Sequence, residues 1–239
     1  MCGICGFIGE VENSKAVLKR MMDKIAHRGP DDEGMYVDAH AAIGHRRLSI
    51  IDLNHGAQPM YNETGDIAIV FNGEIYNHLD VRKELIAKGH VFANESDTEC
   101  LVHAYEEYGT DMLSKLRGMF SFVIWDSKNK TAFGARDHFG IKPFYYSQIN
   151  GSLAFSSEIK AILEFPGFKK EVNEEALEQY LSFQYSVLPE CFFKGVYKLP
   201  AGHYMIYKNG EMTVKRYFDP MMEPKENGDL EKTVSEIEE

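Results

Sequence analysis

The second residue of the chain is a cysteine, and its type and position suit nucleophilic chemistry. A small side chain at position 2 permits removal of the initiator methionine, which leaves a thiol and a free α-amine together on Cys2. An α-amine has a reference pKa of about 8 and a cysteine thiol one of about 8.5, so the amine can accept the thiol proton without a large pKa shift. Cys2 could therefore act as a nucleophile with its own general base, and no catalytic histidine is required.

Cys2 and Cys5 also form a C-x-x-C pattern, which is the spacing of redox dithiols and of half a zinc site. The other two cysteines, Cys100 and Cys191, are isolated in the sequence, and neither a second C-x-x-C nor a His-x-x-x-His pattern accompanies them. A redox C-x-x-C usually opens a helix, whereas this one opens an apolar run typical of a strand. We therefore rank metal and redox roles last and expect Cys5 to be a small buried hydrophobe.

The composition is that of a folded protein with an acidic balance. Of 239 residues, 44% are hydrophobic and 26% are charged, which is enough apolar surface for a sizeable core. Asp and Glu outnumber Lys and Arg by 37 to 26, and the net charge of -11 disfavours nucleic acid and anionic membrane surfaces as partners. No signal-peptide pattern and no stretch long enough to cross a bilayer occurs, so we expect a cytoplasmic protein.

The elements that must position the reactive groups come in runs of strands and runs of helices. Apolar alternation and turn residues predict strands at 4–8, 35–37, 41–44, 48–51 and 67–71, and hairpins at 120–126 with 131–136 and at 204–208 with 212–216. Helical spacing predicts helices at 13–25, 79–88, 98–108, 158–163 and 174–183. Because antiparallel hairpins dominate and strands do not alternate strictly with helices, we expect an α+β fold.

The strand at 67–71 leads directly into polar residues that could bind a ligand. We expect it to end in a turn at Asn72-Gly73-Glu74, because glycine frees the backbone to turn and to approach a ligand closely. Loops at strand ends are a usual place for binding and catalytic residues. The sequence therefore predicts chemistry at this turn as well as at Cys2.

A series of motifs resembles a known enzyme family. The motifs are Cys2 to Ile4, His27 to Asp31, His45 to Asp52, Gln58 to Met60, Asn72 to Asn77, Ser96 to Glu99, Gly118 to Phe122, Arg136 to Pro143 and Ser157 to Ala161. In this order they resemble the N-terminal glutaminase domain of asparagine synthetases, a class II glutamine amidotransferase domain. The likeness runs from Cys2 to about Pro220.

The resemblance implies both a fold and a mechanism. The fold is that of the N-terminal-nucleophile hydrolases, a four-layer αββα sandwich of two antiparallel sheets between helices. Cys2 is then the nucleophile that attacks the side-chain amide of L-glutamine, while its α-amine takes and returns the proton, giving a thioester and ammonia. The side-chain amide of Asn72 and the backbone N–H of Gly73 are implied to form the oxyanion hole.

The resemblance also implies a substrate-binding set: Arg47, Leu48, Ile50, Asn72, Gly73, Glu74 and Asp97. Arg47 is expected to pair with the α-carboxylate of glutamine, and Asp97, with Glu74 near it, to hold the α-ammonium. This assignment fits the chemistry, because selective binding of a zwitterionic amide needs one cation, one anion and donors aimed at a developing oxyanion.

Each of these residues also has a plainer interpretation on its own. Arg47 could be one of an exposed pair with Arg46, Asp97 could cap a helix before Thr98, and Asn72-Gly73 could be an ordinary turn. Taken together with Cys2, the functional interpretation is favoured. The remaining candidates, His27 to Asp31, Asp137 and His138, are assigned roles in loop order and packing, because the α-amine already supplies the base.

The domain organisation follows from where the likeness ends. We predict a glutaminase domain at 1–220, and at 221–239 a linker followed by the start of an ATP-dependent synthetase domain that these residues do not include. No metal or cofactor is expected in the glutaminase domain, and ATP and Mg²⁺ are expected only in the synthetase domain. The expected partners are L-glutamine and that C-terminal domain of the same polypeptide, with no nucleic acid or membrane; a homo-oligomer is compatible with the sequence.

The expected function is hydrolysis of L-glutamine to glutamate and ammonia, with the ammonia used for ATP-dependent asparagine synthesis from aspartate. Two alternatives stay open at this point. The domain could serve a related amidotransferase with another ammonia acceptor, or it could bind glutamine without turnover.

Overall fold

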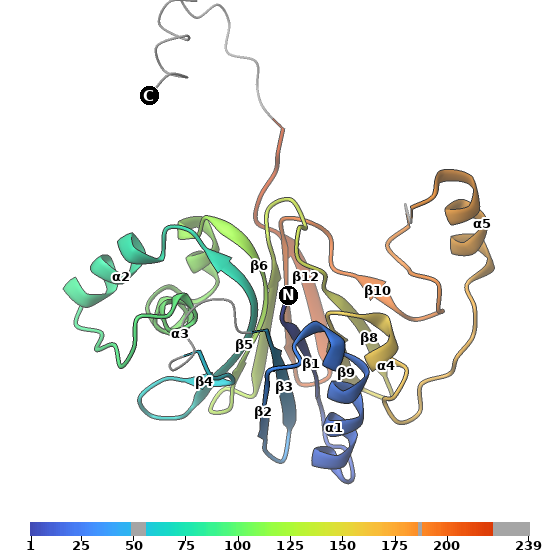
Figure 1. Ribbon diagram of the computed structural model, residues 1–239, viewed down its shortest axis with the longest axis horizontal. Coiled ribbons are helices and arrows are strands. Elements are labelled where there is room, and N and C mark those ends of the chain that lie inside the picture. Colours follow the sequence, from blue (N-terminus) through green and yellow to red (C-terminus); the bar gives the residue numbers. More distant parts are fainter. Residues whose placement is uncertain (49–55, 186–187, 222–239) are drawn as a thin grey trace, which may run out of the picture.

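The computed structural model describes residues 1–48, 56–185 and 188–221. Within them, two six-stranded antiparallel sheets face each other, and helices lie on their outer sides (Figure 1). Sheet A has the spatial order β10 (Tyr197–Lys198), β8 (Tyr145–Ile149), β9 (Ser152–Ser156), β1 (Gly3–Ile8), β3 (Ala41–Arg47) and β2 (Asp32–Val37). Sheet B has the order β12 (Glu211–Arg216), β11 (His203–Lys208), β7 (Thr131–Arg136), β6 (Gly118–Asp126), β5 (Ile67–Ile75) and β4 (Met60–Tyr61).

Helices form the two outer layers. On sheet A pack α1 (Ser14–Lys24) and α4 (Ile159–Ile162), and a short 3-10 helix (Ala26–Arg28) follows α1. On sheet B pack α2 (His78–Ala87) and α3 (Asp97–Tyr108), followed by a second 3-10 helix (Gly109–Lys115). The last helix, α5 (Glu174–Phe183), stands apart from the sheets at one edge of the molecule (Figure 1). The predicted α+β class and its four-layer sandwich are confirmed.

The alternation of side chains along each strand creates the layers. In β1, Ile4 and Ile8 belong to the core between the sheets, while Cys5 and Phe7 belong to the core under α1 and α4. Successive side chains of a strand point to opposite faces, so one apolar strand serves two cores. A third core lies between sheet B and its helices, and Phe71 of β5 is part of it. The apolar runs in the sequence therefore reflect strands buried on both faces.

Most predicted elements occur where the sequence indicated, including both hairpins. The predicted turn at Asn72-Gly73-Glu74 is wrong, because β5 continues to Ile75 and stays paired with β6 up to Ile75↔Gly118. Gly73 serves close packing instead, since a Cβ there would lie 2.3 Å from the backbone oxygen of Met119 on β6.

The strands β8 and β9 were not predicted, although a signal for them exists. Asn150 and Gly151 connect them with positive φ angles of 50° and 77°, the same geometry as Asn209 and Gly210 between β11 and β12. Of the predicted strand at 48–51, only Leu48 is described, and it lies outside any strand, one residue after the end of β3. Residues 49–51 lie outside the described residues, so the rest of this strand stays a prediction.

Two further expectations concern the C-terminal segment and membrane-spanning helices. The predicted linker and helix start at 221–239 lie, apart from Met221, outside the described residues, so the division at residue 220 stays a prediction. Among the residues that the structure describes, no helix combines the length and the apolar character that crossing a membrane requires.

Candidate active site

The N-terminal thiol faces the gap between the two sheets. Ile4 and Ile8 face this gap, so Cys2, two residues before Ile4, lies on the same face of the chain. The pairing Gly3↔Arg46 of β1 with β3, continued by one residue, places Cys2 opposite Arg47. Its Sγ lies 3.5 Å from the backbone nitrogen of Leu48 and 3.9 Å from the Leu48 oxygen. Figure 1 shows the N-terminus at the centre of the molecule, beside the strands of both sheets.

Contacts from Arg28, after α1, and from Ser157, before α4, hold the start of β1 in place. Arg28 Nε donates to the carbonyl oxygen of Cys2 at 2.9 Å, and Arg28 Nη1 is 3.1 Å from Glu158 Oε1. Ser157 Oγ accepts from the N–H of Ile4 at 3.0 Å, and the Ser157 N–H donates to the Ile4 oxygen at 2.8 Å. The sequence predicts that the segment from His27 to Asp31 orders the surrounding loops, and the contacts of Arg28 agree with this role.

The structure separates the two cysteines of the C-x-x-C pattern. Residues three apart in a strand point to opposite faces, so Cys2 faces the gap while Cys5 is buried under α1. Burial raises the pKa of Cys5, and it raises that of Cys100 to about 12 and that of Cys191 to about 11. These three thiols stay protonated near neutral pH and are poor nucleophiles. The two cysteines of the pattern cannot share a disulfide or a metal ion without rearrangement of β1.

β5 presents the predicted oxyanion-hole residues to the same gap. Ala68 and Val70 of this strand belong to the core between the sheets, so Asn72 and Glu74 face the same side. Asn72 is only 2% exposed, and its Nδ2 has no hydrogen-bond partner among the described residues. A buried amide donor without a partner is costly, so its retention indicates a group that binds there.

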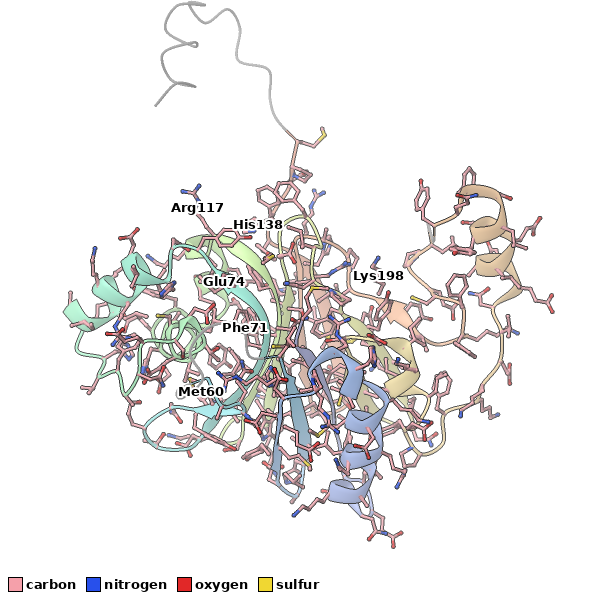
Figure 2. All side chains as sticks on the ribbon, viewed as in Figure 1. Met60, Phe71, Glu74, Arg117, His138 and Lys198 are labelled. Carbon is pink, nitrogen blue, oxygen red and sulfur yellow. The ribbon has the colours of Figure 1, made fainter. Side chains whose placement is uncertain are left out.

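The backbone N–H of Gly73 faces the open edge of β5. Along this edge, the N–H of Phe71 donates to Gln58 Oε1 at 2.7 Å and the N–H of Ile75 donates to Asp97 Oδ2 at 2.9 Å. N–H groups two residues apart in a strand point the same way, so that of Gly73 points between these two contacts. Figure 2 shows Phe71 and Glu74 along β5 on one side of the sheets, with Lys198 on the other side. The Asn72 amide and the Gly73 N–H are therefore adjacent donors at the rim of the gap.

Arg46 and Arg47 face opposite sides of β3. Arg46 forms ion pairs with Asp23 at 2.7 Å and with Glu33 at 2.6 Å on the helix side of sheet A. Arg47 is only 9% exposed, and a Cβ added at Gly56 would lie 2.5 Å from its Nη2, so the guanidinium packs against the Gly56 backbone. The plainer interpretation of an exposed arginine pair is wrong.

Asp97 is the first residue of α3, and its carboxylate is turned toward β5. The N-cap is Ser96, whose Oγ accepts from the N–H of Glu99 at 3.3 Å, so Asp97 is not the cap. Burial raises the pKa of Asp97, and the nearby charge of Glu74 raises it further. A partly dehydrated carboxylate beside a second carboxylate is suited to bind a cation.

The structure thus places the described members of the predicted set at the start of β1, the end of β3, the end of β5 and the start of α3. Cys2 and Leu48 are in contact, Arg47 lies opposite Cys2, and Asn72, Gly73, Glu74 and Asp97 gather at the end of β5. Ile50, the remaining predicted substrate contact, lies outside the described residues.

Sequence reasoning missed two buried polar residues next to Asn72. His45 of β3 lies close to the backbone of Phe71 across the gap, and burial, reinforced by the charge of Arg47, lowers its pKa to about 4. Ser121 of β6 lies opposite Asn72 and is fully buried. Neither His45 Nε2 nor Ser121 Oγ has a hydrogen-bond partner among the described residues. Strand alternation could have found both residues. His45 is two residues from Arg47 and faces the same side of β3, and Ser121 is two residues from the core residue Val123 on β6.

A rigid loop after β7 closes the site on another side. The carboxylate of Asp137 is fully buried and accepts four backbone N–H groups at 2.9 to 3.2 Å, those of Phe120, Phe139, Ile141 and Lys142. Arg136 Nε donates to the Lys142 oxygen at 2.7 Å, Nη1 donates to the Leu199 oxygen at 2.7 Å, and Nη2 donates to the Gly140 oxygen at 2.5 Å. The loop-order role that the sequence predicts for Asp137 agrees with these contacts.

One group of residues with metal-binding side chains lies away from this site. His90, His103 and Glu106 bring potential ligand atoms within 4.8 Å of one another. His103 Nδ1 is hydrogen bonded to Glu106 at 3.0 Å, and its ring packs edge-on against Phe92, at 4.6 Å between the ring centroids. These contacts account for the group as packing between the end of α2 and α3.

Comparison with known proteins decides the family. A family model described as "Glutamine amidotransferase domain" matches residues 1–218. The chain belongs to this family. Among curated relatives of this amidotransferase domain, "Asparagine synthetase [glutamine-hydrolyzing] 1" from Bacillus subtilis is 41% identical, covering 98% of this chain and 38% of the relative. "Asparagine synthetase [glutamine-hydrolyzing] 2" from Arabidopsis thaliana is 36% identical over 92% of this chain and 33% of the relative.

A solved structure supports the fold of the amidotransferase domain. The "glutamine phosphoribosylpyrophosphate (PRPP) amidotransferase from B. subtilis" has a TM-score of 0.66 to this chain at 19% identity, covering 91% of this chain and 49% of that one. At this identity the likeness is one of fold. The chain spans well under half the length of the curated asparagine synthetases that it matches.

Proposed function

We propose that this amidotransferase domain hydrolyses L-glutamine to glutamate and ammonia through a thioester on Cys2. The observation that supports this most directly is the buried side-chain amide of Asn72, whose Nδ2 has no partner among the described residues and which faces the same gap between the sheets as the N-terminal thiol. The reaction needs Cys2 to be the first residue, so removal of Met1 is part of the proposal. The catalytic set is Cys2, Asn72 and Gly73.

The proposed reaction proceeds in two steps. The Cys2 thiol transfers its proton to its own α-amine, and the sulfur attacks the side-chain carbon of glutamine while Asn72 and Gly73 donate to the oxyanion. As the tetrahedral intermediate collapses, the C–N bond breaks and the α-ammonium gives the proton to the leaving group, which departs as ammonia. Water then adds to the thioester with the amine as base, the C–S bond breaks, and glutamate leaves.

Substrate selection rests on fixed charges at the rim. Arg47, whose planar fork suits a carboxylate, pairs with the α-carboxylate of glutamine in this proposal. Asp97, with Glu74 beside it, holds the α-ammonium. Leu48, which contacts the Cys2 sulfur, and Ile50 complete the set. An amide lacking either α-group is expected to be a poor substrate.

The fate of the ammonia extends the proposal to a longer protein. Relatives named as glutamine-hydrolysing asparagine synthetases are more than twice as long as this chain, which supports a C-terminal ATP-dependent synthetase domain as its partner. In that arrangement ATP and Mg²⁺ act in the partner domain, and the ammonia goes to aspartate. Four free thiols are in keeping with the reducing cytosol as its location.

The test compares the full chain, shown by intact mass to lack Met1, with Cys2→Ala and Cys5→Ala variants. Glutamate release from glutamine is expected from the parent chain and from Cys5→Ala, and none from Cys2→Ala. A glutamine-like diazoketone is expected to add one adduct, on Cys2. A Met1-free chain that releases no more glutamate than Cys2→Ala contradicts the proposal, and saturable glutamine binding without any adduct assigns the domain to binding alone.

A further inference from the structure

Lys142 is a buried cation without a paired carboxylate. Lys142 is only 6% exposed, and among the described residues no carboxylate oxygen lies within 4.0 Å of its Nζ. Removing an ammonium from water is costly unless an opposite charge offsets it, so buried lysines are normally paired. A buried lysine without a paired carboxylate is a candidate for function.

The loop after β7 aims this ammonium at the chain's first residues. The backbone N–H of Lys142 donates to Asp137 Oδ2 at 2.9 Å, and its carbonyl oxygen accepts from Arg136 Nε at 2.7 Å. Its Nζ lies 3.4 Å from the sulfur of Met1, the residue directly before the nucleophile. Loss of Met1 leaves the ammonium facing the start of the chain with that contact gone.

Several charges surround Lys142, and among them the Cys2 sulfur is bonded only to the backbone of Leu48 within the described residues, with no charged partner. Burial lowers the pKa of Lys142, while a thiolate at Cys2 and the carboxylates of Asp137 and Glu74 raise it and Arg28 lowers it further. Asp137 is satisfied by four backbone N–H groups, and Glu74 lies across the gap at the exposed end of β5.

Two arginines also carry positive charge near the nucleophile. Arg28 binds the Cys2 carbonyl oxygen through Nε but is paired with Glu158 at 3.1 Å, which offsets its charge. Arg47, the last residue of β3, packs against Gly56, and in the proposed function it pairs with the α-carboxylate of the substrate. Lys142 therefore differs from both arginines, because its charge has no carboxylate beside it.

We propose that the ammonium of Lys142 is the counter-ion of the Cys2 nucleophile, which it stabilises as a thiolate before attack and again when the thioester is hydrolysed. The proposal rests on Cys2 being the nucleophile of the proposed function. Lys142 exchanges no proton in it: the thiol proton passes to the α-amine, and the fixed charge favours the ionised sulfur. Lys142 thus acts through Cys2, by placing a fixed positive charge near its sulfur. Substrate recognition rests on Arg47 and Asp97 instead.

The test measures the pH dependence of Cys2 alkylation by iodoacetamide, followed by intact mass on the Met1-free full chain. In Lys142→Met and in Lys142→Gln, the midpoint of the pH–rate curve is expected to rise by about one unit, which slows alkylation about tenfold below the midpoint. Lys142→Arg keeps the charge and is expected to stay near the parent midpoint. Lys198→Met removes a partly buried lysine on β10, three strand positions from β1 in sheet A, and is expected to leave the curve unchanged.

The same variants are assayed for glutamine hydrolysis, where the acid limb of the pH profile is expected to move with the alkylation midpoint while KM changes little. A parent midpoint in Lys142→Met and Lys142→Gln overturns the proposal, as does a Lys142→Arg variant that loses as much as Lys142→Met. A parent chain that is alkylated but releases no glutamate counts against the proposed function alone, because the alkylation midpoint still decides the role of Lys142.

Discussion

On the strand faces that lie between the two sheets, three buried polar atoms have no hydrogen-bond partner among the described residues. They are His45 Nε2, Asn72 Nδ2 and Ser121 Oγ. Leaving such an atom unsatisfied costs about 1–3 kcal/mol, so three of them on the facing sides of the two sheets are a local cost that ordinary packing does not explain. The cost is offset once a ligand supplies hydrogen bonds, which suits a site that receives a substrate amide and its oxyanion. Their side chains come from three strands, β3, β5 and β6.

Asp97→Asn separates binding from stability. Loss of a charge-assisted hydrogen bond to the substrate ammonium is expected to raise KM for glutamine about 10- to 100-fold, while kcat falls less. Because the folded state raises the pKa of Asp97, the ionised carboxylate is destabilising at neutral pH, and the variant should unfold at the same or a higher temperature. Steady-state kinetics and thermal unfolding at pH 7 check both parts.

Glu95→Gln is the matched control for Asp97→Asn, because Glu95 is an exposed carboxylate two residues earlier. It is expected to change neither KM nor the unfolding temperature. An Asp97→Asn variant with the parent KM removes Asp97 from the ammonium site.

At the scale of elements, the site is built from strand ends rather than from turns. The sequence places Asn72 and Gly73 correctly next to chemistry, but it predicts a turn because asparagine and glycine usually mark one. Pairing with β6 overrides that preference and keeps β5 extended to Ile75, so both donors gain the rigidity of a sheet. Local propensity could not show this, because the deciding contact, between Gly73 and the Met119 backbone, is distant in sequence.

Other parts of the site were predictable because they depend on local pattern. The inward direction of Cys2 and Arg47 follows from strand alternation, and the start of α3 near Asp97 follows from its capping residue. Lys142 lies within the motif from Arg136 to Pro143, but the sequence assigns it no role, because its burial depends on the fold of the loop after β7.

Asp137→Asn tests that loop. Replacing one carboxylate oxygen by an NH₂ group puts a donor against backbone donors, so the free energy of unfolding is expected to fall by about 2–3 kcal/mol. Glutamine turnover should fall with it, because the backbone that holds Lys142 and Phe120 loses its anchor. Urea unfolding and glutamate release measure the two effects. Asp111→Asn, a change at an exposed carboxylate, is expected to alter neither, and parent stability in Asp137→Asn would show that the loop does not depend on this carboxylate.

At the scale of the whole molecule, the two sheets must stay in fixed relation, because Cys2 and Arg47 come from sheet A and Asn72 from sheet B. The apolar core between the sheets supplies most of this contact, and its residues follow the period of two that the sequence displays. His45 of β3 is buried between the sheets, close to the backbone of Phe71 on β5. Because its ring is buried and neutral, protonation of His45 destabilises the folded state.

The stability of the whole fold is therefore expected to fall between about pH 6.5 and pH 4. The folded state lowers the pKa of His45 to about 4, so the unfolded chain, with a histidine pKa of about 6.5, binds the proton first as the pH falls. Stability from this group is fully present above pH 6.5 and decreases by about 3 kcal/mol on reaching pH 4. His138, whose pKa burial also lowers, acts in the same direction. His45→Gln is polar but does not titrate, so urea unfolding across this range should show a shallower pH dependence than the parent chain. Parallel curves for the two proteins would mean that the pKa of His45 is the same in the folded and unfolded states and that His45 is not the acid-sensitive group.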